Sequence, residues 1–266
     1  MEISFSDGNY YEEKFDSRVF LETYFNSTSG HRQENEFLTF SLKNLVNVFS
    51  NGPKFRRLLE IGSGPCLHFA LCASGHAEEI VLSDFVRSNC QEIKLWLKND
   101  PGAFDWSHFA KLVCELEGNR EKWTEKEKKL RDSVKQVLKC DVNQTNPLDP
   151  VELEPVDCLM TSLCLEVACK DKAAYCAALR NVTALLKPGG VLIMNGVLNQ
   201  TFYTVNNHKF SCVKFDQAFL RKIVKEVGYE IEQLEIFDGL DKSQNTLSDF
   251  NAIFFLVALK NKNAPC

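Results

Sequence analysis

The chain has 266 residues, with 31 basic and 36 acidic side chains, a net charge of −5 and a hydrophobic content of 44%, which is ordinary for a globular protein. No apolar run approaches the roughly 20 residues that span a bilayer, and the acidic start of the chain is unlike a secretory signal. We therefore expect a cytoplasmic monomer with reduced thiols, no membrane association and no nucleic-acid partner held through phosphate contacts.

The first 50 residues are predicted to be helical, because apolar residues from Phe37 to Phe49 recur at helical spacing. An aromatic-rich stretch precedes them, with rings at Tyr10, Tyr11, Phe15, Phe20, Tyr24 and Phe25. Two interpretations of this stretch stay open. The simpler one is a helix packed on the core, and the other is an aromatic lid over a pocket.

After the breaker at residues 51–53, strand and helix patterns alternate. Helices are predicted at residues 66–74, 89–98, 119–135 (densely charged and solvated), 171–186 and 215–227. Strands are predicted at residues 58–61, 80–84, 134–142 (buried), 156–163, 191–197, 229–237 and 251–259. A turn at residues 187–190 separates a helix from a strand, and residues 201–213 have the pattern of a hairpin that turns at Asn206-Asn207.

This alternation is typical of the α/β class, with an open, mostly parallel seven-stranded sheet and helices on both faces. We expect one domain over residues 1–266. Three segments are predicted additions to it: the helical residues 1–50, an insertion at 100–135 and the hairpin at 198–214. The eleven cysteines contain no Cys-x-x-Cys pair and the five histidines no His-Glu-x-x-His motif, so no metal site is predicted.

The first strand-to-helix turn, residues 60–65 (EIGSGP), is the predicted ligand site. Ligands of such sheets bind beyond the carboxyl ends of the strands, and Gly62 and Gly64 let the backbone approach them closely. Asp84 ends the second strand, 22 residues after Gly62. A carboxylate at this distance binds ribose hydroxyls in nucleotide folds. A structural alternative for Asp84 is a helix cap or a turn residue.

The kind of nucleotide follows from two further positions. Leu67 stands where a dinucleotide fingerprint has its third glycine, which counts against a dehydrogenase. Asp141 and Val142, at the end of the third strand, could hold an adenine edge. Acids after two strands and a glycine-rich first turn favour S-adenosylmethionine over a nicotinamide dinucleotide.

At this point the chain resembles a family of small-molecule methyltransferases, those that methylate nicotinamide, phenylethanolamine and indolethylamine on nitrogen. The resemblance covers essentially the whole chain, and the amine-methylating members are the most similar. It is carried by residues 61–65 (IGSGP), 103–106 (AFDW), 116–119 (LEGN), 135–142 (KQVLKCDV) and 185–190 (LLKPGG). The family has a Rossmann-like class I methyltransferase fold with an N-terminal helical lid.

The resemblance implies a set of S-adenosylmethionine contacts, with S-adenosylhomocysteine as product. Gly62, Ser63 and Gly64 would line the methionine part, Asp84 the ribose, and Asn89 the methionine carboxylate. Asp141 and Val142 would hold the adenine, and Ser162 stands where the family has a threonine or alanine. Tyr24 would belong to the lid. Phe20, Phe25 and His68 replace residues that are usually tyrosine in relatives, which removes two hydroxyls from the cofactor site.

The resemblance also implies an acceptor site. Glu166 stands where amine-methylating relatives place an amine-binding carboxylate, and Asp249 lies near another such position. The aspartate that nicotinamide-methylating relatives use would be Gly196 here, which favours an amine over nicotinamide. The remaining implied acceptor contacts are Tyr11, Leu163, Gln200, Tyr203 and Cys212.

A sulfonium methyl group is already activated, so positioning of the acceptor nitrogen is expected to supply most of the catalysis. Because only a neutral amine has a free lone pair, Glu166 is the candidate catalytic residue, anchoring the ammonium and relaying its proton. A carboxylate at a helix start is the structural alternative for Glu166. Nicotinamide or another pyridine, a thioether, and a non-catalytic cofactor-binding role remain alternative functions.

Overall fold

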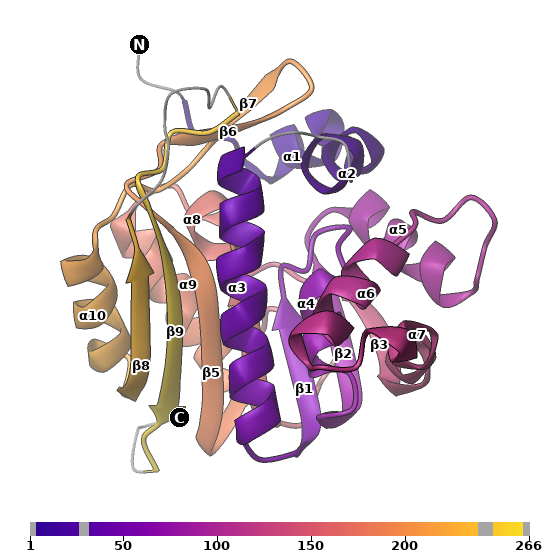
Figure 1. Cartoon of the computed structure of the whole chain (residues 1–266). Coiled ribbons are helices and arrows are strands. Elements are labelled where there is room, and N and C mark those ends of the chain that lie inside the picture. The colour runs from indigo at the N-terminus through magenta and orange to yellow at the C-terminus, as the bar shows by residue number, and fades with distance from the viewer. Residues whose placement is uncertain (1–3, 27–31, 239–246, 263–266) are drawn as a thin grey trace.

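The structure, a computed structural model, describes residues 4–26, 32–238 and 247–262, and a seven-stranded sheet runs through its centre (Figure 1). The strands are β1 (Phe55–Ile61), β2 (Ala77–Asp84), β3 (Val134–Lys139), β4 (Val156–Ser162), β5 (Leu186–Leu198), β8 (Tyr229–Phe237) and β9 (Ala252–Lys260). Their order in space is β3-β2-β1-β4-β5-β9-β8. Neighbours are parallel except at β9, which runs antiparallel to β5 and β8. The predicted mostly parallel α/β sheet is confirmed.

Helices cover both faces of this sheet (Figure 1). One face carries α3 (Arg32–Asn51), α4 (His68–Ala73), α5 (Arg87–Leu97), α6 (Ser107–Leu116) and α7 (Trp123–Ser133), with the 3-10 turn η1 (Arg120–Lys122) before α7. The other face carries α8 (Leu165–Ala168), α9 (Lys172–Ala184) and α10 (Gln217–Glu226). Among the described residues, the structure has no helix with the length and apolarity to cross a membrane.

Above the carboxyl ends of the strands lie two short helices, α1 (Gly8–Lys14) and α2 (Ser17–Phe25), and beside them the hairpin β6 (Phe202–Val205) and β7 (His208–Ser211) (Figure 1). The hairpin turns at Asn206-Asn207 as predicted, with Asn206 in the left-handed region at φ 56°. Ligands of parallel sheets bind at this end. The helices α1 and α2 and the hairpin β6–β7 therefore form a roof over the position expected for a ligand.

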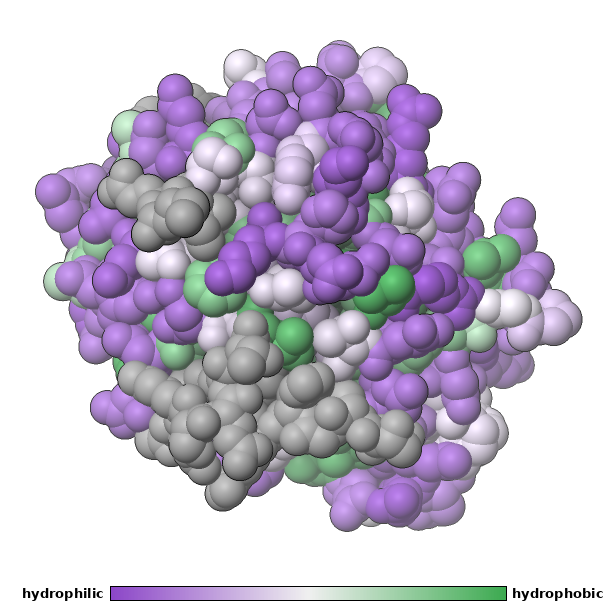
Figure 2. All heavy atoms as spheres, turned by 90° about the horizontal axis from the view of Figure 1, so that it is seen from above, coloured by the Kyte–Doolittle hydropathy of each residue, from purple (hydrophilic) through white to green (hydrophobic). Residues whose placement is uncertain are grey.

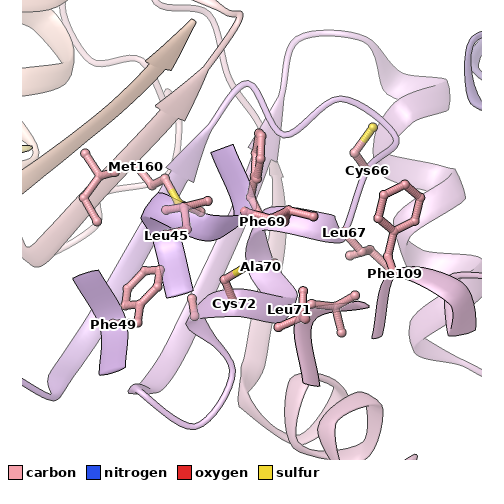
Figure 3. Packing of buried hydrophobic residues seen from close by; sticks show 14 of the residues in the cluster. Leu45, Phe49, Cys66, Leu67, Phe69, Ala70, Leu71, Cys72, Phe109 and Met160 are labelled. Carbon is pink, nitrogen blue, oxygen red and sulfur yellow. The ribbon is translucent and has the colours of Figure 1, made fainter. Parts of the chain in front are cut away.

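The sheet is buried on both faces, which its strand sequences explain. Successive residues of a strand point to opposite faces, and Leu58 and Leu59 of β1 join two different hydrophobic clusters. Near α4, side chains from α3, α6 and β4 pack against its residues, as Leu45, Phe109 and Met160 show (Figure 3). A parallel sheet needs this double cover, because its strands are apolar on both sides.

Aspartates set the starts of several helices. Asp7 begins α1 and accepts a hydrogen bond from the Tyr10 amide at 2.9 Å, and Asp16 does the same for the first turn of α2. Asp171 and Asp216 cap α9 and α10 in the same way. These caps satisfy amide groups that the first helical turn leaves without partners. The two roof helices therefore begin at positions that the sequence specifies.

Two predicted elements differ from the structure, and one helix was not predicted. The strand expected to be buried at residues 134–142 is an edge strand, β3, that ends at Lys139 and is partly exposed, because it has only β2 beside it. The turn expected at residues 187–190 lies inside β5: the register with β4 steps from Leu186 to Val191, so these residues form a bulge. No helix was predicted at α6, which buries Phe109 and Val113.

Candidate functional site

A cavity of about 310 Å³ opens at the carboxyl ends of the parallel strands. Strand order reverses there, because β1 lies between β2 and β4, and this is where α/β sheets bind ligands. Its walls come from the segments after β1, β2, β3 and β4 and from the roof. Of the predicted site residues it is lined by Tyr11, Phe20, Tyr24, Phe25, Gly62, Ser63, Gly64, His68, Asp84, Asn89, Asp141, Val142, Ser162, Leu163, Gln200 and Tyr203.

The glycine turn after β1 forms the floor of the cavity. Gly62 and Gly64 have φ angles of 72° and 61°, in the left-handed region that favours glycine. A Cβ on Gly62 would lie 2.3 Å from the Cys164 sulfur, so the turn after β1 and the turn after β4 are in direct contact. The Ser63 hydroxyl is buried, and among the described residues it has no hydrogen-bond partner. It is therefore available to a ligand in the cavity.

Asp84, the last residue of β2, is held by the backbone around it. Its carboxylate accepts hydrogen bonds from the Gly64 amide at 2.7 Å, the Val86 amide at 2.9 Å and the Asn89 side chain at 2.9 Å. The Asn89 oxygen in turn accepts a bond from the Ser17 hydroxyl of α2 at 2.7 Å. Burial raises the pKa of Asp84. The turn contacts foreseen as the structural alternative are thus present, and the residue also lines the cavity.

Glu60 begins the glycine turn and is not among the predicted ligand contacts, but it also lines the cavity. Its side chain is buried, and Oε2 makes no hydrogen bond to any residue that the structure describes. Burial, reinforced by the charge of Asp84, raises the pKa of Glu60 to about 8. The sequence does contain a signal: Glu60 is an acid in a strand whose neighbours Leu59 and Ile61 are fully buried. A buried acid without a partner suits a cationic ligand.

His68 lines the cavity and lies among aromatic rings. Its ring centroid lies 4.9 Å from that of Phe25 and 5.9 Å from that of Trp106. Burial lowers the pKa of His68 to about 3, so the imidazole is neutral at pH 7. Its Nδ1 and the Ser162 hydroxyl are both buried and have no partner within the described part of the chain. Both atoms are free to bond a ligand.

Asp141 and Val142 follow β3 on the far side of Asp84. The Asp141 carboxylate accepts bonds from the Asn143 amide at 3.0 Å and the Gln144 side chain at 3.3 Å. The Val142 carbonyl accepts a bond from the Asn181 side chain at 3.0 Å. These bonds fix the turn, and both residues line the cavity.

The roof is held together by bonds between the N-terminal helices and the hairpin. The hydroxyls of Tyr11 and Tyr203 lie 3.0 Å apart, and the Tyr24 hydroxyl donates to the Thr204 carbonyl at 2.8 Å. Ser6 and Ser211 exchange bonds between the amide of each and the hydroxyl of the other. Seen from above, this face is mostly hydrophilic with small apolar patches near its middle (Figure 2). Tyr11, Phe20, Tyr24 and Phe25 of the aromatic stretch line the cavity, as the lid interpretation expects, and their role as a lid stays a prediction.

Four predicted acceptor residues are not among those that line the cavity: Glu166, Gly196, Cys212 and Asp249. Asp249 bonds the amides of Thr201 and Phe202 at 2.7 and 3.2 Å and so fastens the start of the hairpin. A Cβ on Gly196 would lie 2.8 Å from the Phe254 ring and 3.1 Å from the Glu166 Oε1, which leaves room only for glycine.

Glu166 lies in the first turn of α8, just behind Cys164, which does line the cavity. It is 4% exposed, and its Oε1 has no hydrogen-bond partner among the residues described. Burial raises the pKa of Glu166 to about 7. A carboxyl with this pKa exchanges a proton readily near neutral pH.

Leu163, which lines the cavity, lies in the loop between β4 and α8. It is one of few non-glycine residues in the left-handed region, at φ 49°, and its side chain is 37% exposed. Its amide bonds the Asn195 carbonyl at 3.1 Å, which ties the loop to the end of β5. The strained backbone is thus held in place at the cavity edge.

Comparisons with known proteins agree with this geometry. The model of the NNMT/PNMT/TEMT family matches residues 3–261. Nicotinamide N-methyltransferase from Homo sapiens is 43% identical over 98% of both chains, and indolethylamine N-methyltransferase from Oryctolagus cuniculus is 43% identical over 98% of both. The solved structure of magnesium protoporphyrin IX methyltransferase from Synechocystis PCC 6803 with bound SAM has a TM-score of 0.61 at 11% identity, over 98% of this chain and 100% of that one.

Proposed function

Because the chain belongs to the NNMT/PNMT/TEMT family, we propose that its methyl acceptor is the nitrogen of a small arylalkylamine of the indolethylamine type. The protein is an S-adenosylmethionine-dependent N-methyltransferase with a class I fold. The observation that carries the amine assignment is Glu166, a buried carboxyl with one unpartnered oxygen behind the acceptor end of the cavity.

The residues of the cavity fit the cofactor. Acids stand at the tips of β1 and β2 and after β3, and the buried hydroxyls of Ser63 and Ser162 have no partner among the described residues. We assign the ribose to Asp84, the adenine to Asp141 and Val142, and the methionine part to residues 60–64 with Asn89 and His68. Glu60 would face the α-ammonium group, since its buried carboxyl has no counter-charge among the residues that the structure describes.

Bound S-adenosylmethionine supplies an activated methyl group, and the protein has to bring a neutral nitrogen to it. The roof encloses the reactants: Phe20, Tyr24 and Phe25 of α2 line the cavity, and so do Tyr11 and Tyr203, whose hydroxyls join α1 to the hairpin. Holding two reactants in one orientation and excluding water accounts for most of the rate gain in such a transfer.

Glu166 takes the proton in this proposal. An arylalkylamine is protonated at pH 7 and has no lone pair until it loses a proton. With a pKa of about 7, the Glu166 carboxyl anchors the ammonium and accepts its proton, directly or through water. The Val213 amide donates to the Glu166 carbonyl at 2.7 Å, which ties Glu166 to the segment that follows the hairpin.

A labelled-methyl assay on tryptamine, phenylethanolamine, nicotinamide and a dialkyl thioether tests the assignment. We expect transfer to the amines, and Glu166→Gln is expected to lower kcat/KM for them by about 10²-fold. Any transfer to nicotinamide should change little, because its ring nitrogen has no proton to lose. Glu235→Gln, on the exposed side of β8, is the matched control.

Three results would contradict the proposal. A clear preference for nicotinamide would replace the amine with a pyridine. Unchanged amine kinetics in Glu166→Gln would remove the role of Glu166. Tight cofactor binding with no transfer to any of the four compounds would favour a binding protein without activity.

A further inference from the structure

Ser17, the first residue of the roof helix α2, is buried and bonds the cofactor end of the cavity. Its hydroxyl donates to the Asn89 side-chain oxygen at 2.7 Å. The nitrogen of the same amide donates to the Asp84 carboxylate at 2.9 Å, and the Gly64 amide donates to the other oxygen of that carboxylate at 2.7 Å. These three partners line the cavity, whereas Ser17 is not among the described residues that line it. Ser17 can therefore act on a ligand only through its partners.

The hydrogen bonds from Ser17 to Asp84 run in one direction. A carboxylate accepts hydrogen bonds, so the Asn89 nitrogen faces Asp84 and the Asn89 oxygen faces Ser17. The Ser17 hydroxyl has one hydrogen, which that oxygen takes, and the Ser88 hydroxyl at 2.7 Å is then a donor to Ser17. Bonds aligned in this way polarise and strengthen one another. Among the described residues, Ser17 is the one partner of the Asn89 side-chain oxygen, so its hydroxyl sets the orientation of the amide.

A second anchor holds α2 outside this chain of hydrogen bonds. Asp16 caps the helix by accepting hydrogen bonds from two amides of its first turn, each at 3.0 Å, which fixes where α2 begins. The partly exposed Arg18 forms an ion pair with Glu92 of α5 at 2.8 Å and donates to the Gly102 carbonyl. None of these bonds reaches the cofactor end. Ser17 and Arg18 therefore fasten the same helix in two ways, one to the cofactor end and one to α5 and the loop that follows it.

We propose that Ser17 is a positioning residue for cofactor binding, because its hydroxyl orients the Asn89 amide and, through it, the Asp84 carboxylate. The proposal rests on the assignment of Asp84 to the ribose under the proposed function, and it does not depend on the acceptor. Phe20 and Phe25, the α2 rings predicted to contact the cofactor, carry no hydroxyl, so Ser17 supplies a polar connection between α2 and the cofactor end. Energetic coupling is reciprocal, so a bound cofactor should in turn stabilise α2 against local opening.

Calorimetry with S-adenosylhomocysteine tests this connection without requiring methyl transfer. We expect Ser17→Ala to bind this product about tenfold more weakly than the wild type does, the effect of one hydrogen bond in a chain that ends at a carboxylate. Arg18→Gln, which loosens the same helix from outside, is the matched control and should keep the affinity within about twofold. Ser88→Ala removes a bond to the Ser17 hydroxyl but leaves the connection to Asp84 intact, so it should also stay within about twofold.

Three readouts separate a positioning role from a merely structural one. In Asn89→Ala the connection to Asp84 is already cut, so adding Ser17→Ala should weaken binding by less than about twofold further. In steady-state kinetics, Ser17→Ala should raise the KM for S-adenosylmethionine and leave kcat and the acceptor KM unchanged, because only cofactor binding is affected. Hydrogen exchange should show that S-adenosylhomocysteine slows the exchange of α2 amides in the wild type and slows it less in Ser17→Ala.

The outcomes separate this proposal from the proposed function. Equal losses of affinity in Ser17→Ala and Arg18→Gln would mean that any anchor of α2 serves, and additive losses with Asn89→Ala would mean that Ser17 does not act through Asn89; either result rejects the positioning role. If Asp84→Asn weakens cofactor binding tenfold or more and Ser17→Ala leaves it unchanged, the assignment of the ribose stands and this proposal fails. Unchanged affinity in Asp84→Asn would reject that assignment and the proposal with it. Because no acceptor is present in the calorimetry, its result holds whether or not an amine is methylated.

Discussion

The two ends of the cavity are built in different ways. The cofactor end consists of turns at the tips of β1, β2, β3 and β4, fixed by backbone bonds such as Gly64 to Asp84. It carries the acids Glu60, Asp84 and Asp141. The α2 rings Phe20, Tyr24 and Phe25 are predicted cofactor contacts that line the cavity. The acceptor end consists of α1 and the hairpin, joined mainly through side-chain hydroxyls such as Tyr11 and Tyr203. Its lining is aromatic and uncharged.

This difference matches two separate tasks. The cofactor end has to hold one cationic ligand, and a rigid sheet with buried acids does that. The acceptor end has to admit one acceptor and reject others, and additions outside the sheet can vary without disturbing it. Changes at the cofactor end should therefore abolish all methyl transfer, and changes at the acceptor end should alter which compound is used.

The largest effect is expected at the cofactor end, from Gly62→Ala. The new Cβ would need a left-handed backbone and would lie 2.3 Å from the Cys164 sulfur. Strain and overpacking together should cost about 3 kcal/mol of unfolding free energy. Cofactor affinity, measured by calorimetry, should fall by about 10²-fold or more, since the turn has to shift.

Gly118→Ala is the control for strain alone. Gly118 has φ 76°, but no atom of the described part of the chain, apart from its own neighbours, lies within 4 Å of a Cβ placed there. This variant should lose about 1 kcal/mol of stability and keep its cofactor affinity. If both variants bind the cofactor equally well, the close contact between the β1 and β4 turns does not shape the cofactor end.

The same contrast shows what the sequence could reveal. The glycine turn, Asp84 and the acid after β3 were predictable because strand ends and acid spacing are local features, and every predicted cofactor residue lines the cavity. Glu60 was missed because its neighbours suggest an ordinary buried strand. The three-dimensional structure is needed to see that this buried carboxyl lines the cavity.

The acceptor end was harder to predict for a physical reason. Whether Asp249 and Gly196 face the cavity depends on how the hairpin packs against β9. No local sequence pattern encodes that packing. Asp249 bonds the start of the hairpin. The space beside Gly196 is occupied by the Phe254 ring and the Glu166 carboxyl. The burial of β3 was wrong for a related reason: Val134, Val137 and Leu138 would suit a buried strand, but the topology places them at an edge.

An intermediate effect is expected from the titration of Glu60. Its pKa is raised from 4.5 to about 8 in the folded protein, so between these values the folded state holds a proton that the unfolded state has lost. The free energy of unfolding without cofactor should therefore fall as pH rises through this window, by up to about 1.4 kcal/mol per pH unit for this group. Chemical denaturation from pH 5 to 8 measures this slope.

Glu60→Gln should flatten that slope, and Glu230→Gln, exposed on β8, should leave it unchanged. Cofactor affinity should rise with pH up to about 8 in the wild type, because a cation favours the ionised carboxyl, and binding should release a proton to the buffer. An unaltered slope in Glu60→Gln would show that Glu60 is not the titrating group of the cofactor end.

The smallest effect is expected at the acceptor end, from removing the hydroxyls of Tyr11 and Tyr203. Each of Tyr11→Phe and Tyr203→Phe breaks the same 3.0 Å bond, at a cost of about 1 kcal/mol. The acceptor KM should rise about threefold to tenfold, with cofactor affinity unchanged. The double variant should resemble either single one, because the two hydroxyls bond each other and their effects are coupled.

Tyr10→Phe is the control for these variants. Among the described residues, the Tyr10 hydroxyl makes a 3.5 Å contact with His208 and no shorter one. Additive effects, or a loss of cofactor affinity equal to the change in acceptor KM, would mean that the roof acts on both ends and that the division between them does not hold.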